Sequence, residues 1–399
     1  MVAAAGAILV PQRTVRQQPT ATSAEEGRRP MTMSHRERVE AALRREEPDR
    51  CPMQISFTPE FAARLRDDMG VRGELNVARG GEHNPHGGGN TYELERAIGS
   101  DLILTSVGWA NNYYAGHDTY TDEWGVTWKE HPYETPFGTG HYTEMVGFPL
   151  AEDAAIEAYV PPDPHRPELY VDSERVIGEY GDEYWIVGVT VTTIFETAWA
   201  LRGYERLLMD LIMAPELADR VLEIPFRYHL AAAEKLAAMG VDMIWTGDDI
   251  GSQKGMLFHP DTWRRFLKPR MAELVSRVKA INPELKVAYH TDGDVREVIP
   301  ELIEIGIDVL NPVQPACMDP AELKRDYGDR LLFWGSIDEQ KTLPFGTADD
   351  VRDEIRLRLE TIGAGGGLIL GPPHHVQLDT PLENFWAMIE TIRKTPYGS

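Results

Sequence analysis

The sequence contains very few cysteines: 2 in 399 residues, Cys51 and Cys317. Two thiols cannot build a disulfide framework or a four-cysteine metal site, and this scarcity is typical of proteins from a reducing compartment. Long apolar runs are also missing, since no stretch approaches the roughly 20 residues that cross a bilayer. We therefore expect a cytoplasmic protein without a membrane-spanning segment.

Basic charge is scarce as well. The chain has 40 Lys and Arg against 64 Asp and Glu, which gives a formal net charge of −24. Such a surface repels phosphate backbones and anionic lipid headgroups, so nucleic acid and membranes are not expected as partners. Hydrophobic residues make up 42% of the chain, enough for a large core.

The first 33 residues differ in composition from the rest. The apolar run at 3–10 is short and follows no basic segment, so it does not match a signal peptide. Residues 11–30 are polar and contain several prolines, a composition typical of disorder. We predict a disordered tail over 1–33 and one domain over 34–399.

From residue 184 onward, short apolar runs alternate with amphipathic stretches, which indicates parallel strands covered by helices. Strands are predicted at 184–190, 242–247, 285–290, 308–311, 331–335 and 367–371, and helices at 198–211, 215–239, 261–281, from 295, at 320–327, 348–362 and 382–394. Two earlier strands, at 52–57 and 101–106, bring the number to eight, which favours a (β/α)₈ TIM barrel. A doubly wound sheet is the alternative, but no Gly-x-Gly-x-x-Gly opens the first helix.

Residues 107–183 interrupt this alternation and are rich in aromatic and turn residues, which predicts an inserted hairpin. Two interpretations stay open. The rings either pack the hairpin onto the barrel or form an aromatic wall over the mouth, with Trp109 contacting substrate.

The predicted carboxyl ends of the strands carry acids, amides and histidines, where barrel enzymes place their chemistry. Glu196 and Asp249 are the catalytic candidates, and a buried Glu196 would need a partner. The substrate-binding candidates, besides Trp109, are Gln253, Gln314, Asp338 and His375. Structural roles are the alternative for several acids: Asp248 and Asp249 as a capping pair, Asp294 as a helix cap, and Asp338 as the residue that orders its loop.

His290, Asp292 and His374 are the candidate metal ligands. Residues i and i+2 of a strand point to one side, so His290 and Asp292 can converge, and His374 could approach from the eighth strand. Two imidazoles and a carboxylate with one open position are typical of catalytic zinc. The alternative is a metal-free pair of histidines. His375 should face away from His374, because neighbouring residues of an extended chain alternate.

Several of these segments resemble the uroporphyrinogen decarboxylase superfamily. They are Arg36-Glu-Arg-Val-Glu-Ala-Ala-Leu-Arg-Arg-Glu-Glu-Pro-Asp-Arg-Cys-Pro, Thr246-Gly-Asp-Asp-Ile-Gly-Ser-Gln, His290-Thr-Asp-Gly-Asp-Val, Asp308-Val-Leu-Asn-Pro-Val-Gln-Pro and Phe333-Trp-Gly-Ser-Ile-Asp. The resemblance runs from about residue 34 to the end and implies a (β/α)₈ barrel. The decarboxylase itself has an arginine-rich segment after its first strand and an aspartate after its second. Here the matching stretches are Gln54-Ile-Ser-Phe-Thr-Pro-Glu-Phe and Thr105-Ser-Val-Gly-Trp, so porphyrinogen decarboxylation is disfavoured.

The other large branch consists of methyltransferases that act with corrinoid proteins and bind zinc through a His-x-Cys motif and a later cysteine. The matching residues here are His290, Asp292 and His374. This set would leave about +1 on the zinc, which favours polarising an ether oxygen over holding a thiolate.

The resemblance thus implies transfer of a methyl group from a methoxylated, aromatic substrate to a corrinoid (cobalamin) on a partner protein. A homodimer is the assembly to test. The alternatives are a metal-free decarboxylase or lyase that uses Asp249, Glu196 and His374 on a small carboxylated substrate, and a non-catalytic binding barrel.

Overall fold

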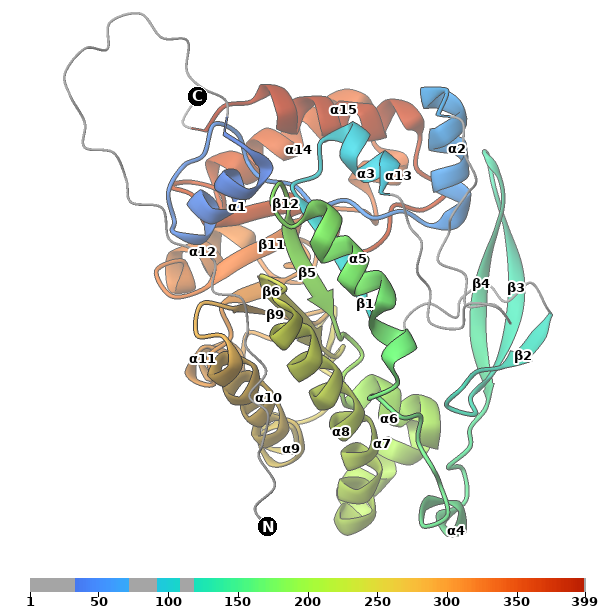
Figure 1. The fold of residues 1–399 in the computed structure, drawn as a ribbon. Coiled ribbons are helices and arrows are strands. Elements are labelled where there is room, and N and C mark those ends of the chain that lie inside the picture. Colours follow the sequence, from blue (N-terminus) through green and yellow to red (C-terminus); the bar gives the residue numbers. More distant parts are fainter. Residues whose placement is uncertain (1–32, 72–91, 108–117, 398–399) are drawn as a thin grey trace, which may run out of the picture. The chain divides into compact units, whose positions relative to one another are not determined.

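The computed structural model describes residues 33–71, 92–107 and 118–397, which belong to one compact unit starting at Met33. Its centre is a curled, all-parallel seven-stranded sheet with the order β1-β5-β6-β9-β10-β11-β12 (Figure 1). The strands are β1 (Leu102–Ser106), β5 (Trp185–Val189), β6 (Met243–Gly247), β9 (Lys286–His290), β10 (Val309–Asn311), β11 (Leu332–Ser336) and β12 (Leu368–Gly371). Seven of the eight predicted strands are confirmed, each within two residues at either end.

The eighth predicted strand, at 52–57, is wrong as a regular strand. This segment makes only isolated parallel bridges to the β12 side, Met53 with Leu370 and Phe57 with Val376. The Met53 carbonyl also accepts a hydrogen bond from the Asp101 N–H, just before β1. The segment therefore contacts both edges of the sheet without forming a continuous ladder.

The helices of the described residues follow the predicted alternation. They are α1 (His35–Leu43), α2 (Pro59–Met69), α3 (Glu93–Ile98), α4 (Asp153–Ile156), α5 (Val171–Tyr180), α6 (Phe195–Arg202), α7 (Tyr204–Met213), α8 (Pro215–Met239), α9 (Pro260–Phe266), α10 (Lys268–Ile281), α11 (Ile299–Glu304), α12 (Pro320–Tyr327), α13 (Thr342–Phe345), α14 (Ala348–Glu360) and α15 (Leu382–Lys394). In this part of the chain no helix has the length and apolar character to cross a membrane.

Three predicted helices differ from the structure. The stretch 198–211 is two helices, because Gly203 with φ +91° separates α6 from α7. The stretch 261–281 is also divided, at Leu267, between α9 and α10. The helix predicted from Val295 begins only at Ile299, with Pro300 in its first turn.

The strands bury side chains on both faces, and these form two separate cores. One core, inside the sheet, includes Val187, Met243, Ala288, Val309 and Trp334, with Trp245 packed against it. The other takes the alternate positions, such as Ile186, Ile244 and Val287, under the surrounding helices. The alternation gives each strand an inner and an outer face, as in barrel proteins. Val39 and Leu43 place α1 at the inner core, at the amino ends of the strands.

Within the range predicted as an insert, the structure has an antiparallel sheet of β2 (Thr119–Thr121), β3 (Thr127–Thr135) and β4 (Gly138–Gly147). The same range also contains α5, which packs on β1 and β5 of the main sheet. A short 3₁₀ helix (Pro167–Tyr170) precedes α5. Trp109 and the tail at 1–32 lie outside the described residues.

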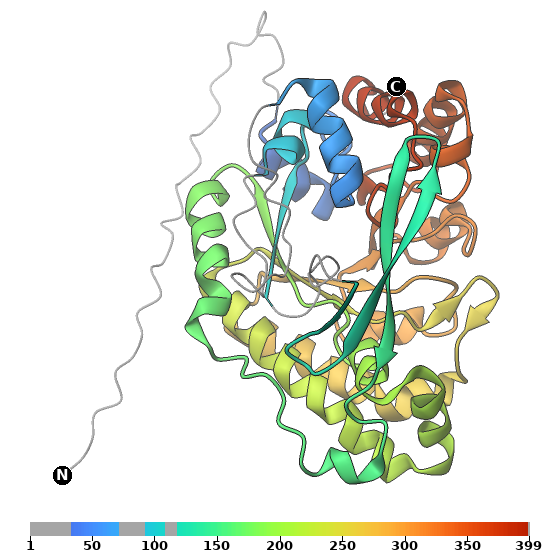
Figure 2. The same ribbon diagram turned by 90° about the vertical axis from the view of Figure 1, so that its right-hand side faces the viewer.

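The hairpin of β3 and β4 reaches α2 and the loop after β12 (Figure 2). The Arg64 guanidinium stacks 3.8 Å from the centre of the Phe137 ring. A Cβ at Gly138 would contact Leu378, in the loop after β12. The first of these segments follows residues 52–57 and the second follows the carboxyl end of β12. Trp124 is buried against Tyr228 of α8, with ring centres 4.8 Å apart, so packing is the correct interpretation for this ring. A role as a lid stays a prediction.

Candidate active site

His290 ends β9 on the inner face of the sheet. The strand register pairs it with Gly247 of β6 on one side and Asn311 of β10 on the other. Trp245 is two residues before Gly247 and therefore shares the inner face, with its ring centre 5.5 Å from that of His290. His290 therefore packs against Trp245 at the end of the inner core.

The loops after β6 and β9 lie backbone against backbone. Gly293 has φ +84°, and a Cβ there would meet the Gly251 carbonyl carbon at 2.4 Å. The Asp294 N–H donates to the Ser252 carbonyl at 2.8 Å and links the same two loops. Only glycine allows this approach at both positions, and it brings Asp249 of one loop next to Asp292 of the other.

Asp249, His290 and Asp292 form a cluster of metal-ligating groups. Each offers one oxygen or nitrogen, and these atoms all lie within 4.8 Å of one another. Asp249 Oδ1 accepts the Asp292 N–H at 2.7 Å and lies 3.5 Å from His290 Nε2. The predicted pair of His290 and Asp292 is therefore brought together, and Asp249, predicted to be catalytic, joins it. His374 is not part of this group.

Of the three groups in the cluster, the Asp292 carboxylate has the least favourable electrostatic environment. Its Oδ1 is buried without a hydrogen-bond partner among the described residues. Burial, with repulsion from Asp249, raises the pKa of Asp292 to about 6, although His290 and a hydrogen bond from Gln314 oppose this. A positive charge at this place would relieve both the desolvation and the repulsion.

Asp248, next to Asp249, has a structural role. Its carboxylate accepts the Ile194 N–H at 2.8 Å and the Glu196 N–H at 3.0 Å, which caps the start of α6. This confirms the capping interpretation for Asp248, although the capped helix follows another strand. Burial raises the pKa of Asp248 to about 6, while these hydrogen bonds oppose the shift.

Glu196 lies in the first turn of α6, and its Oε2 accepts the Asp249 N–H at 3.0 Å. Burial first, and then the charges of Asp249 and Asp248, raise the pKa of Glu196 well above its ordinary value. The partner that the sequence required for this acid is therefore the backbone N–H of Asp249.

His374 and His375 follow β12 and are solvent-exposed. Their rings contact each other edge to face at 4.9 Å, so the expectation that they face opposite sides is wrong. The reason is a bend at residues 373–374, where strand alternation does not apply. Desolvation and then His290 lower the pKa of His374, and Asp249 raises it. His374 therefore lies close enough to His290 and Asp249 to feel their charges, while its ring keeps solvent contact.

Backbone strain concentrates at the same end of the sheet. Thr192, Val313 and Ser336 have positive φ values of 62°, 51° and 75°. They lie at or just after the ends of β5, β10 and β11. Non-glycine residues in this conformation are costly and are typical of functional sites.

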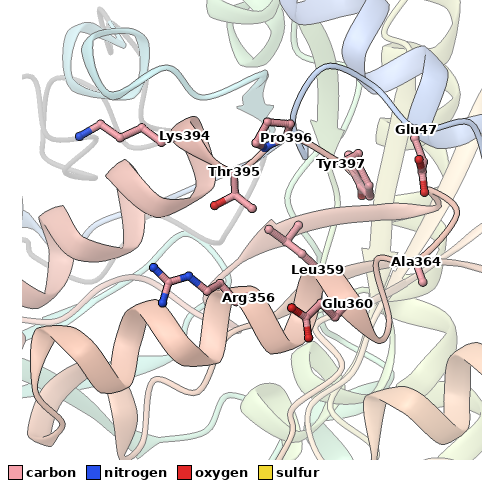
Figure 3. Close-up of a pocket in the computed structure, with 9 residues that line it drawn as sticks. All are labelled: Glu47, Arg356, Leu359, Glu360, Ala364, Lys394, Thr395, Pro396 and Tyr397. Atoms are coloured by element: carbon pink, nitrogen blue, oxygen red, sulfur yellow. The ribbon is translucent and has the colours of Figure 1, made fainter. Parts of the chain in front are cut away.

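A separate pocket lies near the opposite ends of the strands (Figure 3). The residues that line it lie in α14, at and after the end of α15, in the loop before the 52–57 segment and in the loop before β12. They are Glu47, Arg356, Leu359, Glu360, Ala364, Lys394, Thr395, Pro396 and Tyr397. It contains no predicted site residue. The cluster at the carboxyl ends is therefore the better candidate for chemistry.

Comparison with known families matches residues 137–395, more than half of the chain, to the model described as "Uroporphyrinogen decarboxylase (URO-D)". The chain belongs to the uroporphyrinogen decarboxylase family. This confirms the resemblance found in the sequence motifs.

Relatives within the family carry two kinds of name. The chain is 29% identical over 178 residues to "Methylcobamide:CoM methyltransferase MtaA" of Methanosarcina barkeri, covering 45% of this chain and 49% of that protein. It is 24% identical over 173 residues to a uroporphyrinogen decarboxylase of Psychromonas ingrahamii, covering 40% and 47%. The chain thus spans about half the length of the curated relatives it matches. A solved "methyltransferase from Methanosarcina mazei" has the same fold, with a TM-score of 0.64, 20% identity and coverage of 90% and 98%.

The remaining predicted site residues have hydrogen-bond partners in the structure. The Gln314 Oε1 accepts the Gly293 N–H at 2.8 Å. Exposed Gln253 donates to Gln340 at 3.4 Å. The Asp338 carboxylate accepts the N–H groups of Gln340 and Lys341, which orders its own loop. Asp294 accepts the Arg296 N–H in a turn before α11 and is not the cap of that helix.

Two residues of the site were missed by sequence reasoning. Asn311 contacts His290 Nδ1 at 2.7 Å. Glu339 accepts the His374 N–H at 3.0 Å, and burial raises its pKa to about 8. Asn311 could have been found by extending the inner-face alternation from Val309 by two residues. Glu339 has no comparable signal, because it lies in a loop.

Proposed function

We propose that this protein is a zinc-dependent methyltransferase that works with a corrinoid, and that Asp249, His290 and Asp292 hold the metal. The observation that carries the proposal is this cluster of three donors at the carboxyl ends of β6 and β9. The similarity to a methylcobamide-dependent methyltransferase supports the reaction class. We further propose that the seven-stranded sheet and the 52–57 segment together make a complete (β/α)₈ barrel with the β2–β4 sheet as an insert.

The residues fit a divalent cation. Asp292 Oδ1 is a buried acceptor without a partner in the described chain, and His290 Nε2 faces Asp249. Zinc accepts imidazole and carboxylate ligands in this combination and, when bound, would polarise an oxygen atom of the substrate. Two carboxylates neutralise a divalent ion, so the surplus of about +1 expected from two histidines and one aspartate does not apply to this set.

The chemical type of the three donor atoms indicates which class of substrate would suit the site. Oxygen and nitrogen ligands are harder than the thiolates of the methyltransferase branch and suit an oxygen-bearing substrate better than a thiol. Partly exposed Trp245, beside His290, offers an aromatic surface at the same place. We therefore propose a methoxylated aromatic substrate as the methyl donor and the cobalamin of a corrinoid protein as the acceptor.

Glu196 would handle the proton of this reaction. When the methyl group leaves for the corrinoid, the substrate oxygen keeps the electron pair of the broken C–O bond and must take up a proton. Burial and the charges of Asp249 and Asp248 raise the pKa of Glu196, which favours its protonated form, and its Oε2 already accepts the Asp249 N–H. The proton is therefore left on Oε1, from which it can be donated.

The test is a metal and activity assay on the full chain. Purified protein supplied with zinc should bind one ion per chain and convert cob(I)alamin to methylcobalamin with members of a panel of methoxybenzenes, followed by the visible spectrum of the corrinoid. Asp249→Ala and Asp292→Ala should lose both zinc and activity. Asp294→Ala, whose carboxylate pairs with Arg296, is the matched control and should keep both.

A metal-free decarboxylase or lyase is the second candidate. Burial raises the pKa of Glu339 to about 8, so this side chain can supply the acid that such a reaction requires near neutral pH, and the pKa of Glu196 is raised as well. Release of CO₂ from a small carboxylated substrate by protein treated with chelator would favour this candidate and reject the methyltransferase.

A further inference from the structure

Asn311 ends β10 beside His290 and is 2% exposed. Its amide group contacts two side chains and one backbone carbonyl, which belong to three other strands of the sheet. Nδ2 lies 3.2 Å from the Trp334 carbonyl, and Oδ1 lies 3.2 Å from Trp245 Nε1 and 2.7 Å from His290 Nδ1. These contacts decide which way the amide points.

The orientation of the amide follows from two partners that have only one role each. An indole N–H can only donate, so the Asn311 atom that faces Trp245 must be the oxygen. A backbone carbonyl can only accept, so the atom facing Trp334 must be the NH₂ group. A flipped amide would place donor against donor and acceptor against acceptor at the same time.

The fixed oxygen then determines the state of His290. Because Asn311 Oδ1 only accepts, His290 Nδ1 must donate to it and carry a hydrogen. In the neutral ring the other nitrogen, Nε2, is then bare. This nitrogen lies 3.5 Å from Asp249 Oδ1, on the side of the ring where the two carboxylates gather.

We propose that Asn311 is a positioning residue that holds His290 as the Nδ1–H tautomer, with the Nε2 lone pair directed at the cation site. The edge-to-face contact with Trp245 keeps the ring plane in place. A histidine ligand needs its other nitrogen to donate to a fixed acceptor, and this acceptor sets both tautomer and orientation. The effect on methyl transfer rests on the proposed function, whereas the tautomer does not.

The tautomer can be measured directly in metal-free protein. The full chain, labelled with ¹⁵N-histidine and stripped with a chelator, is studied at pH 8 by long-range ¹H–¹⁵N correlation, which distinguishes protonated from bare ring nitrogens. His290→Gln identifies the signals of His290 among the 12 histidines. The expected result is a protonated Nδ1 and a bare Nε2 in the parent protein.

Variants at Asn311 then test the cause. Asn311→Leu removes the acceptor, so His290 should lose its preference for Nδ1–H, and zinc affinity should fall about 10–100-fold. Asn311→Asp keeps an acceptor and should keep the tautomer. Asn384→Leu is the matched control, because Asn384 is equally buried and donates to the carbonyls of Leu343 and Gly346 in another part of the fold. It should destabilise the protein without changing His290.

The outcomes separate this proposal from the proposed function. An Nε2–H tautomer in the parent protein, or an unchanged tautomer in Asn311→Leu, would overturn it. If Asn311→Leu does not fold, the parent spectrum and Asn311→Asp still decide, since loss of Nδ1–H in either contradicts the proposal. A tautomer that depends on Asn311 in a protein that binds no zinc would support the positioning role and reject the zinc methyltransferase.

Discussion

Replacing Asp292 by asparagine should stabilise the metal-free protein while removing its response to zinc. The side chain keeps its shape but loses the charge that burial and Asp249 disfavour. The folded pKa is about 6 against an ordinary 3.8. At 1.36 kcal/mol per unit this corresponds to a penalty of about 3 kcal/mol on the ionised group.

The sign and the pH range follow from this shift. The folded pKa is raised, so the stability that Asp292 contributes is complete below its unfolded pKa of 3.8 and is lost as the pH rises through about 6. The gain from Asp292→Asn should therefore be about 0.3–1 kcal/mol at pH 4.5 and about 1–3 kcal/mol at pH 8, after the same allowance for solvent screening at both pH values. Zinc at 100 times its dissociation constant adds about 2.7 kcal/mol to a protein that binds it.

Urea unfolding at both pH values, with chelator and with zinc, measures these effects. The parent should gain stability with zinc, and the variant should not. Asp294→Asn is the matched control. Arg296 lowers the pKa of Asp294, so this variant should lose stability above pH 4 and keep the zinc response. A metal-free Asp292→Asn protein less stable than the parent at pH 8 would refute the electrostatic reasoning. Retained zinc affinity in that variant would remove Asp292 from the ligand set.

Three further predictions concern the surroundings of the cluster. Asp248→Ala should destabilise the protein by about 2–3 kcal/mol in urea unfolding, because the buried N–H groups at the start of α6 lose their acceptor. Gly293→Ala should weaken zinc binding in a calorimetric titration, because the new Cβ would force the loop away from Gly251; unchanged affinity would show that the two loops can separate freely. His374→Ala and His375→Ala should both keep zinc in elemental analysis and raise the KM for substrate, and zinc loss in either variant would make that histidine a ligand.

Much of the fold could be predicted from the sequence because its signals are local. The boundaries of α8, α12 and α15 match the predicted ones residue for residue. Two of these helices begin with a proline in the first turn, and α12 is capped by Asp319. The strands were found because each is a short apolar run between helices. In these places one stretch of chain contains the whole signal.

The remaining elements depend on contacts between distant segments. The 52–57 segment has the composition of a strand, yet its hydrogen bonds go partly to β12 and partly to Asp101, which no local pattern reports. The association of α5 with the main sheet, inside the range predicted as an insert, is recognised only by its packing on β1 and β5. The amphipathic pattern of α5 would be the same in an insert.

The candidate site, too, combines features that are local in the sequence with features that depend on contacts between distant segments. His290 and Asp292 were predicted together, since two residues of one strand end share a face. The choice between Asp249 and His374 as the next donor depends on distances between strands. The parallel register of β6 with β9 and the two touching glycines bring Asp249 to His290, whereas His374 follows β12, several strands away in the sheet. Family position favoured His374, and backbone packing favours Asp249.

This placement has a chemical consequence. Donors from two adjacent strands would hold a cation at one side of the mouth, because the loops after β6 and β9 are tied to each other. Glu339, after β11, and its hydrogen-bond partner His374, after β12, come from other strands, and both lie near enough for the charges of the cluster to act on them. If a substrate oxygen were bound at the cluster, the rest of the proposed substrate would extend toward these groups. They could donate a proton to it or contact its aromatic ring. With the third donor on β6 instead of β12, the proposed cation would leave the β12 side of the mouth to the proposed substrate.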